Sequence, residues 1–564
     1  MISFDHRKYR PAPVLAMPHR QWPDRTIVKA PVWASVDLRD GNQALLEPMG
    51  LAQKRRLWQL LVRLGLKEIE VGFPAASEPD YAFVRWLIEE DQIPADVTIQ
   101  VLVQAREDLI RRTFESLAGA PRAIVHLYNS TSPVQRDWVF GSDRAGVKAI
   151  AVQGARWVRE AAGRYPQTRW TFQYSPESFT ATEPDYALEV CEAVMDVWEP
   201  TPQRPCIINL PATVEVASPN RFADQVEWFS THVSRRESLV LSVHTHNDRG
   251  GAVAAAELAL LAGADRVEGT LLGNGERTGN MDLVTLAMNL YSQGVDPGLD
   301  LRHPDEILAV VAQCTGIATH PRHPWVGELV YTAFSGSHQD AIRKSLKRQT
   351  SDAPWQVAYL PIDPHDLGRS YQEVVRVNSQ SGKGGVAFVM EQEYGLNLPR
   401  WLQVELSQLV QRESERCGGE VDGVGIERLF REHFVRAQGP RRLLSYRLIR
   451  NRHDQIEVRI GDPTGDYTLR GDGQGAIAAF VDAWTGRVGQ TIQVLDYQEH
   501  AIGAGTDAEA AAYVLLTLDG ARVAGAAIDR DVVGASLKAV LAALNRAVPV
   551  AALDALAVGQ AQAA

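Results

Sequence analysis

Eight short apolar runs, each followed by a longer segment of helical character, occupy the chain from about residue 32 to residue 271. Short apolar runs that alternate with helical segments indicate parallel strands joined by helices. Eight such units in succession favour an α/β fold of the closed (β/α)8 or TIM-barrel type over an open sheet. A barrel of this type carries its chemistry at the carboxyl ends of its strands. The runs are VWASVDL, KEIEVGF, VTIQVLV, RAIVHLY, RWTFQYS, RPCIINL, SLVLSVHTH and DRVEGTL.

The pattern changes beyond the eighth unit. Residues 296–436 predict helices and proline-rich loops, which we interpret as helical linking subdomains. From residue 437 the pattern predicts three strands and a helix, written twice, with a hairpin turn at Asp519-Gly520. We therefore expect a pseudo-symmetric α+β domain of repeated βββα units. The predicted divisions are an N-terminal extension (1–30), the barrel (31–295), the linking subdomains (296–436) and the C-terminal domain (437–564).

Composition narrows the class of protein. With 564 residues, 45% of them apolar and 23% charged, the chain is typical of a folded protein of several domains, which excludes a small binding module. The net charge of -11 opposes a broad nucleic-acid interface. Four widely spaced cysteines without a C-x-x-C pair predict neither a disulfide framework nor a thiolate zinc site. The chain shows no export or membrane segment, so we expect a cytoplasmic protein.

Two of the predicted strand ends carry residues that suit a metal ion. The first run leads into DLRDG and the seventh ends in HTHND. Alternate residues of a strand share a face, so His244 and His246 can both point to one place at the barrel mouth. Two imidazoles and a carboxylate from another strand end, for which we choose Asp40, make an open three-ligand site for a divalent metal. An isolated H-x-H is more often a hydrogen-bonded pair, but this placement favours the metal site.

Two loops at the same rim add polar groups. The glycine-rich loop 273–280 follows the eighth run, and the side-chain carbonyl of Asn280 could bind a metal. Glu177 follows the fifth run and could act on a water or a proton. Each feature alone is more typical of a plain turn or a solvated acid.

Two nucleotide-binding motifs are not predicted. Before the SGKGG stretch, Val377 occupies the place where a Walker loop needs glycine, and Gly384 stands where it needs serine or threonine. The pair Gly503 and Gly505 lacks the third glycine of a dinucleotide fingerprint.

Five motifs together resemble the 2-isopropylmalate synthase family of the acyl-CoA/2-oxoacid Claisen-condensing superfamily. They are DLRDGNQAL, VGFPAASEPD, HTHNDRG, GNGERTGN and RVNSQSGKGG. The resemblance extends from about Tyr9 to Arg546 and is closest to the long form with a C-terminal leucine-sensing domain. DLRDG and HTHND are shared with homocitrate and citramalate synthases. SQSGKGG and HAIGAGTDAEAAAY narrow the choice.

The resemblance implies roles for particular residues. Asp40, His244 and His246 would hold Mg²⁺, Mn²⁺ or Zn²⁺, with Asn280 completing the shell. The implied catalytic residues are Arg39 over the reacting carbonyls, Glu177 facing the metal-bound water, and His338 and Tyr371, which would enter from the partner subunit of a homodimer as candidates for proton transfer. The implied substrate contacts are Leu102, His126, Tyr128, Ser175, Asn209 and Thr213, the last of these on the oxoacid carboxylate. The implied leucine site includes Gly503, Gly505 and Ile528.

The implied reaction condenses acetyl-CoA with 3-methyl-2-oxobutanoate and hydrolyses the thioester to (2S)-2-isopropylmalate and CoA. This is the first committed step of leucine synthesis, with leucine as feedback inhibitor. The metal would act as a Lewis acid on the oxoacid, and a cation such as Arg39 would offset the enolate charge.

Three alternatives remain at this stage. A homocitrate or citramalate synthase would share the barrel motifs, and a lyase could run a retro-aldol cleavage on the same barrel. The apolar Leu102 favours an isopropyl group over a dicarboxylic oxoacid, which would need a cation there. A sensing scaffold with an inactive barrel is disfavoured because every proposed metal ligand is present.

Overall fold

The computed structural model describes residues 8–371, 383–417, 419–435, 439–450, 453–463, 465–489, 491–503, 505 and 508–547. The chain divides into two compact units, Met1–Val330 and Tyr331–Ala564, and each is described here by itself. Val377, part of SQSGKGG, part of HAIGAGTDAEAAAY and residue 437 lie outside the described residues. The domain divisions at residues 30, 295 and 436 stay predictions.

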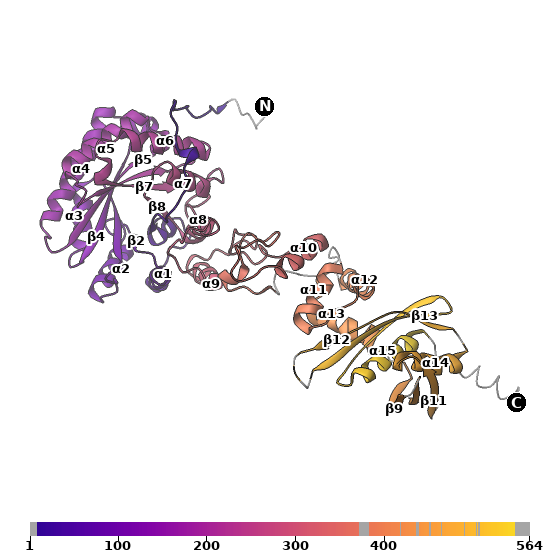
Figure 1. Cartoon of the computed structure of the whole chain (residues 1–564). Helices are drawn as coiled ribbons and strands as arrows, with labels where there is room; N and C mark the ends of the chain where they lie inside the picture. The colour runs from indigo at the N-terminus through magenta and orange to yellow at the C-terminus, as the bar shows by residue number, and fades with distance from the viewer. Residues whose placement is uncertain are drawn as a thin grey trace, which may run out of the picture. The chain divides into compact units, whose positions relative to one another are not determined.

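The first unit contains a closed barrel of parallel strands in sequence order, which confirms the predicted (β/α)8 fold (Figure 1). β8 pairs with β1 and closes the ring, with Val32 opposite Arg266. β6 is buried along its whole length, as expected for a parallel strand covered on both faces. The strands are β1 (Val32–Ser35), β2 (Glu68–Gly72), β3 (Thr98–Gln104), β4 (Arg122–Ser130), β5 (Arg169–Glu177), β6 (Cys206–Ala212), β7 (Leu239–Thr245) and β8 (Arg266–Gly269).

Helices surround the strands on the outside of the barrel (Figure 1). Their starts follow local sequence signals: the Ser77 side chain caps α2, the Asp143 side chain caps α4, and proline occupies the first turn of α5, α6 and α9. They are α1 (Leu51–Arg63), α2 (Glu78–Glu89), α3 (Glu107–Ser116), α4 (Arg144–Gly163), α5 (Pro184–Trp198), α6 (Pro219–His232), α7 (Ala252–Leu261), α8 (Leu283–Tyr291) and α9 (Pro304–Thr315). None of the helices in the described ranges combines the length and apolar character that crossing a membrane requires.

The first strand is shorter than the sequence pattern predicts. It ends at Ser35, and residues Asp37–Gly41 form a π-helical turn in which the backbone N–H groups of Asp40 and Gly41 donate to Val36 O at 2.9 and 3.1 Å. Asp37 is held inside this turn because its carboxylate accepts from the backbone N–H of Leu271 at 3.0 Å. The wide turn therefore brings both Asp37 and Asp40 into the buried end of the barrel.

The second unit begins with helices and ends in two antiparallel sheets. The helices are α10 (Gly336–Leu346), α11 (Lys383–Tyr394), α12 (Arg400–Cys417) and α13 (Gly423–Phe430). The sheets, of order β11-β10-β9 and β12-β13-β14, comprise β9 (Arg442–Arg450), β10 (Asp454–Asp462), β11 (Gly465–Gly473), β12 (Ile492–Ile502), β13 (Glu509–Leu518) and β14 (Ala521–Asp529). Helices α14 (Ala476–Val488) and α15 (Val532–Ala547) follow the first and second triplet. The predicted repeat of βββα units is thus confirmed.

Two features of this unit follow directly from the sequence. The turn between β13 and β14 uses Asp519 and Gly520 at φ values of 45° and 85°, the left-handed pair that a two-residue hairpin turn of type I′ requires. β13 is buried on both faces because one core joins it to α14 and α15 while another joins it to α11–α13. Because neither face of β13 is turned to solvent, its sequence is a continuous apolar run and does not alternate between apolar and polar residues.

Candidate active site

A cavity of about 160 Å³ opens at the carboxyl ends of the barrel strands. It brings together the barrel residues named from the sequence, apart from Asn280, which lies beside it. Those lining the cavity are Arg39, Asp40, Leu102, His126, Tyr128, Ser175, Glu177, Asn209, Thr213, His244 and His246. Four further lining residues, Gln43, Pro211, Glu276 and Arg277, were not named from the sequence.

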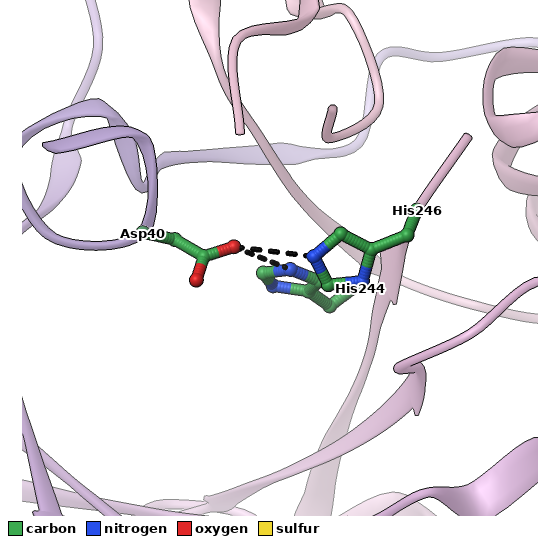
Figure 2. A group of neighbouring side chains, drawn as sticks. All are labelled: Asp40, His244 and His246. Atoms are coloured by element: carbon green, nitrogen blue, oxygen red, sulfur yellow. Dashed lines mark ion pairs between the residues drawn. The ribbon is translucent and has the colours of Figure 1, made fainter. Parts of the chain in front are cut away.

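Asp40, His244 and His246 converge from two parts of the barrel (Figure 2). Oδ2 of Asp40 lies 3.4 Å from Nε2 of His244 and 3.3 Å from Nε2 of His246. All three side chains are buried, and their ligand atoms lie within 4.8 Å of one another. The expectation that His244 and His246 aim at one place is confirmed, although β7 ends at Thr245 and His246 lies just beyond it, and the carboxylate arrives from the turn after β1.

The remaining atoms of these residues fit a cation. Nδ1 of His244 lies 2.9 Å from a Glu268 oxygen and Nδ1 of His246 lies 3.3 Å from Ala212 O, so a proton on each Nδ1 leaves both Nε2 lone pairs free. Oδ2 of Asp40 and Oδ1 of Asn280 are buried and accept no hydrogen bond of normal geometry. Buried oxygen atoms without a donor are costly, and a bound divalent cation would satisfy them.

Charge around the site keeps the carboxylate ionised. Burial acts to raise the pKa of Asp40, but the positive charge of Arg39 together with the imidazoles of His244 and His246 holds that pKa well below its usual range. Burial acts to lower the pKa of His244, whereas the neighbouring carboxylates of Asp40 and Glu268 raise that pKa to about 9. An ionised Asp40 is the form that can bind a metal.

Glu268 links the metal site to a polar network inside the barrel. One of its oxygens accepts from Nη1 of Arg266 at 2.7 Å and from Nε2 of Gln173 at 2.7 Å, and the other faces His244. The carboxylate is fully buried, and although burial acts to raise its pKa, Arg266 together with His244 and His126 keeps that pKa well below normal. Glu268 therefore presents a fixed negative charge to the imidazole of His244.

We expect Glu268→Gln to weaken divalent-metal binding by about 10- to 100-fold, because an amide removes the charge behind His244. Competition with a chelating indicator measures this directly. Glu68→Gln is the matched control, since Glu68 accepts from Nε of the same Arg266 at 2.6 Å but contacts neither histidine. Equal metal affinity in folded Glu268→Gln and in the unmodified protein would contradict the expectation.

Three of the residues implied to surround the substrate, His126, Ser175 and Asn209, belong to one chain of hydrogen bonds. Arg39 donates to Asp40 at 2.6 Å and to Glu70, which lies 2.9 Å from Nδ1 of His126. Nε2 of His126 lies 2.7 Å from Ser175 Oγ, which also accepts from Asn209 at 3.0 Å. These polar groups line one part of the cavity, while Leu102 supplies an apolar wall.

Three rim residues are held by their neighbours. Ser130 Oγ donates to the Glu177 carboxylate, and Gln104 donates to Tyr128 Oη at 2.9 Å. The backbone N–H of Ser178 donates to Thr213 Oγ1 at 2.9 Å, which leaves the threonine hydroxyl hydrogen available to another acceptor.

The remaining residues named from the sequence lie in the second unit. The His338 ring stacks on Tyr359 with 4.0 Å between centroids. Tyr371 Oη donates to Asp363 at 3.1 Å, and burial raises the pKa of Tyr371 to about 12. The implied roles of His338 and Tyr371 in proton transfer stay predictions.

The residues implied to bind leucine occupy the second triplet of strands. Gly503 and Gly505 follow β12 with φ values of 85° and 95°. Ile528 on β14 pairs with Ala511 and packs against the core shared with α11–α13. The leucine site at these residues stays a prediction.

Sequence reasoning missed the charged residues inside the barrel. Glu68 and Glu70 in β2, and Arg266 and Glu268 in β8, lie two positions apart in otherwise apolar strands. That spacing places each pair on one face of its strand, which is a signal that could have been followed. Which charges meet across the barrel depends on strand register, and the pattern along the chain does not contain it.

The fold and this constellation define a class of protein: a (β/α)8-barrel enzyme with a candidate divalent-metal centre at its strand ends. The family model described as HMGL-like matches residues 30–311. The model described as "Alpha-isopropylmalate synthase, post-catalytic domain-like" matches residues 328–391, and "LeuA allosteric (dimerisation) domain" matches residues 420–548. These three matches follow one another along the chain.

Curated relatives extend the similarity to nearly the whole chain. A 2-isopropylmalate synthase of Pseudomonas fluorescens is 56% identical over 551 residues, and the match covers 97% of this chain and 98% of the relative. One of Alcanivorax borkumensis is 56% identical over 547 residues, with the same coverage. A solved hydroxymethylglutaryl-CoA lyase of Pseudomonas aeruginosa is 19% identical, with a TM-score of 0.43, over 52% of this chain and 95% of that chain. The chain belongs to the 2-isopropylmalate synthase family, as its motifs predicted.

Proposed function

We propose that the barrel site condenses acetyl-CoA with 3-methyl-2-oxobutanoate and hydrolyses the thioester, releasing (2S)-2-isopropylmalate and CoA. The observation that carries this proposal is the meeting of Asp40, His244 and His246 beside an apolar wall at Leu102, in a chain 56% identical to 2-isopropylmalate synthases. The product would enter leucine biosynthesis.

The protein's own residues would bind and polarise the reactants. A divalent cation held by Asp40, His244 and His246, with Asn280 nearby, would supply Lewis acidity toward the 2-oxo group. The Thr213 hydroxyl would donate to the oxoacid carboxylate, and Leu102 would contact the isopropyl group.

Two charged residues complete the proposed chemistry. Arg39, whose side chain is 10% exposed, would stabilise the negative charge that develops when acetyl-CoA loses a methyl proton. Glu177, oriented by Ser130, would exchange a proton at the reacting centre. The identity of the ion, Mg²⁺, Mn²⁺ or Zn²⁺, is left open by this donor set.

The test is a free-thiol release assay with acetyl-CoA against 3-methyl-2-oxobutanoate, pyruvate and 2-oxoglutarate, with the product identified by mass spectrometry. The proposal predicts that 3-methyl-2-oxobutanoate gives the highest kcat/KM and yields 2-isopropylmalate. Highest kcat/KM with 2-oxoglutarate would assign a homocitrate synthase, and with pyruvate a citramalate synthase. Absence of thiol release with all three would refute the condensation.

We further propose that the C-terminal domain binds leucine as an inhibitor and joins two subunits in a homodimer. The match to an allosteric dimerisation domain over residues 420–548 supports this assignment. Gly503 and Gly505 leave room for backbone N–H groups to approach a carboxylate, because among the described residues no atom beyond the adjacent residues lies within 4 Å of the position that a Cβ would take on either glycine.

Leucine is expected to lower turnover by about 5- to 150-fold, the range of ordinary coupling free energies, and Gly503→Val should remove most of that inhibition. Steady-state rates with and without leucine measure both effects. Gly520→Val is the matched control, because Gly520 has the same φ of 85° and an equally open Cβ position, but lies at the β13–β14 turn. Loss of inhibition in both variants would indicate a general strain effect, and retention in both would remove Gly503 from the leucine site.

A further inference from the structure

Arg277 ties together three loops at the mouth of the barrel. Its Nε donates to Asp248 Oδ1 at 2.6 Å, in the loop after β7, and its Nη2 donates to the backbone oxygen of Thr213 at 2.6 Å, in the loop after β6. Arg277 itself belongs to the loop after β8 and lines the reaction cavity. One guanidinium therefore connects the loops that follow β6, β7 and β8.

The backbone at Arg277 is held in an unfavourable conformation. Its φ is 57°, in the left-handed region that is unfavourable for a residue with a side chain. Such a conformation persists only where surrounding contacts over-determine it, and it is common at functional sites. The contacts with Asp248 and Thr213 are the ones that hold the arginine here.

Asp248 is itself fixed, so it orients the guanidinium. Its Oδ2 accepts from the backbone N–H of Glu215 at 2.9 Å, two residues beyond Thr213. Arg277 and Asp248 thus hydrogen-bond to the two ends of the segment 213–215. These two contacts fix the backbone from which the Thr213 side chain extends.

Among the described residues, none accepts the hydroxyl hydrogen of Thr213. Its Oγ1 already accepts from the backbone N–H of Ser178, and its carbonyl oxygen accepts from Arg277. The hydroxyl hydrogen remains to donate into the cavity, which Thr213 lines. A hydroxyl that donates to a carboxylate must be held in direction and distance, because hydrogen bonds weaken steeply when misaligned.

We propose that Arg277 is a positioning residue for the oxoacid substrate, which acts by holding Thr213 in place to bind the substrate carboxylate. The inference rests on the proposed function, since it takes a 2-oxoacid as the ligand of Thr213. Arg277 would thereby affect the affinity for the oxoacid and leave both metal binding and the acetyl-CoA site unaffected.

The experiment compares Arg277→Ala and Arg277→Lys with the unmodified full-length enzyme. The KM for 3-methyl-2-oxobutanoate should rise about 10- to 100-fold in Arg277→Ala, as expected for the loss of a charged hydrogen bond. The KM for acetyl-CoA and the metal dissociation constant should change by less than about threefold. Arg277→Lys should retain part of the defect, because an ammonium cannot reproduce a two-pronged contact.

Arg236→Ala is the matched control. Arg236 also donates to a carboxylate, Asp265 at 2.7 Å, and to a backbone oxygen, that of Gly263 at 2.8 Å, but it precedes β7 at the opposite end of the barrel. The Arg236→Ala variant tests how much stability is lost when an arginine with this pair of contacts is removed. We expect Arg236→Ala to lower thermal stability without changing the KM for the oxoacid.

A double-mutant cycle with Thr213→Ala tests whether Arg277 acts through Thr213. Adding Arg277→Ala to Thr213→Ala should raise the oxoacid KM by less than about threefold, because the group being positioned is already absent. If the two substitutions raise the oxoacid KM independently, so that their effects multiply, the proposal is overturned. An unchanged oxoacid KM in Arg277→Ala, or a loss of metal affinity as large as the rise in that KM, would overturn it too.

The unmodified enzyme separates this proposal from the function on which it rests. If it condenses a different 2-oxoacid, the proposed function fails while the same cycle, run with that oxoacid, still tests Arg277. Added guanidinium offers a second readout for Arg277→Ala: partial recovery of the oxoacid KM supports a positioning role. If folded Arg277→Ala keeps the normal KM for the oxoacid and added guanidinium does not change it, the result counts against a positioning role.

Discussion

A His246→Ala protein is expected to lose its divalent cation and at least about 10³-fold of kcat/KM, because the Lewis acidity supplied there stabilises developing charge by several kcal/mol. Nε2 of His246 lies 3.3 Å from the buried Oδ2 of Asp40, and the imidazole is one of the three side chains that could hold a metal there. Metal analysis of the purified protein and thiol release should show both losses together. Chelation of the unmodified enzyme should abolish turnover, and readdition of Mg²⁺, Mn²⁺ or Zn²⁺ should restore it.

The matched control for this loss is His232→Ala. His232 ends α6 and stacks on Trp228 with 4.3 Å between ring centroids, away from the lining of the reaction cavity. Its removal should change neither metal content nor turnover. Full activity of metal-free His246→Ala would show that the reaction proceeds without the proposed ion.

The second large effect concerns substrate choice: 3-methyl-2-oxobutanoate should exceed 2-oxoglutarate in kcat/KM by more than about 10³-fold, since burying an unpaired carboxylate costs several kcal/mol. Leu102 is 7% exposed and gives the cavity an apolar wall. The two arginines that line the cavity are engaged, Arg39 with Asp40 and Glu70 and Arg277 with Asp248. Neither is free to pair with a second substrate carboxylate.

Leu102→Arg should reduce this preference by about tenfold or more, because it introduces the missing cation. Leu102→Met is the control, since it conserves volume and apolar character and should retain the preference. Steady-state kinetics with both oxoacids measure the ratio. Similar kcat/KM values for the two substrates in the unmodified enzyme would place the activity with the homocitrate synthases.

Local patterns along the chain were sufficient to predict the barrel, the repeated βββα units and two of the side chains that converge at the candidate metal site. The alternation of apolar runs and helical segments is a property of neighbouring residues, so it can be recognised before any contact between distant residues is known. The same holds for His244 and His246, whose separation by two positions at the end of β7 turns them to the same side. The Asp519-Gly520 turn was likewise evident, because only certain residues accept its backbone angles.

Only the tertiary structure decided how distant charges are paired. The π-helical turn that ends β1 early brings Asp40 within 3.4 Å of both Nε2 atoms, and the register of β8 against β7 brings Glu268 within 2.9 Å of His244. The contacts of Arg277 with Thr213 and Asp248 join positions 64 and 29 residues apart. The amino-acid sequence by itself determined which strands and helices form and which side chains could bind a metal. Closure of the barrel decided which charges neutralise one another, because a shift of one residue in strand register turns every side chain of that strand to the opposite face.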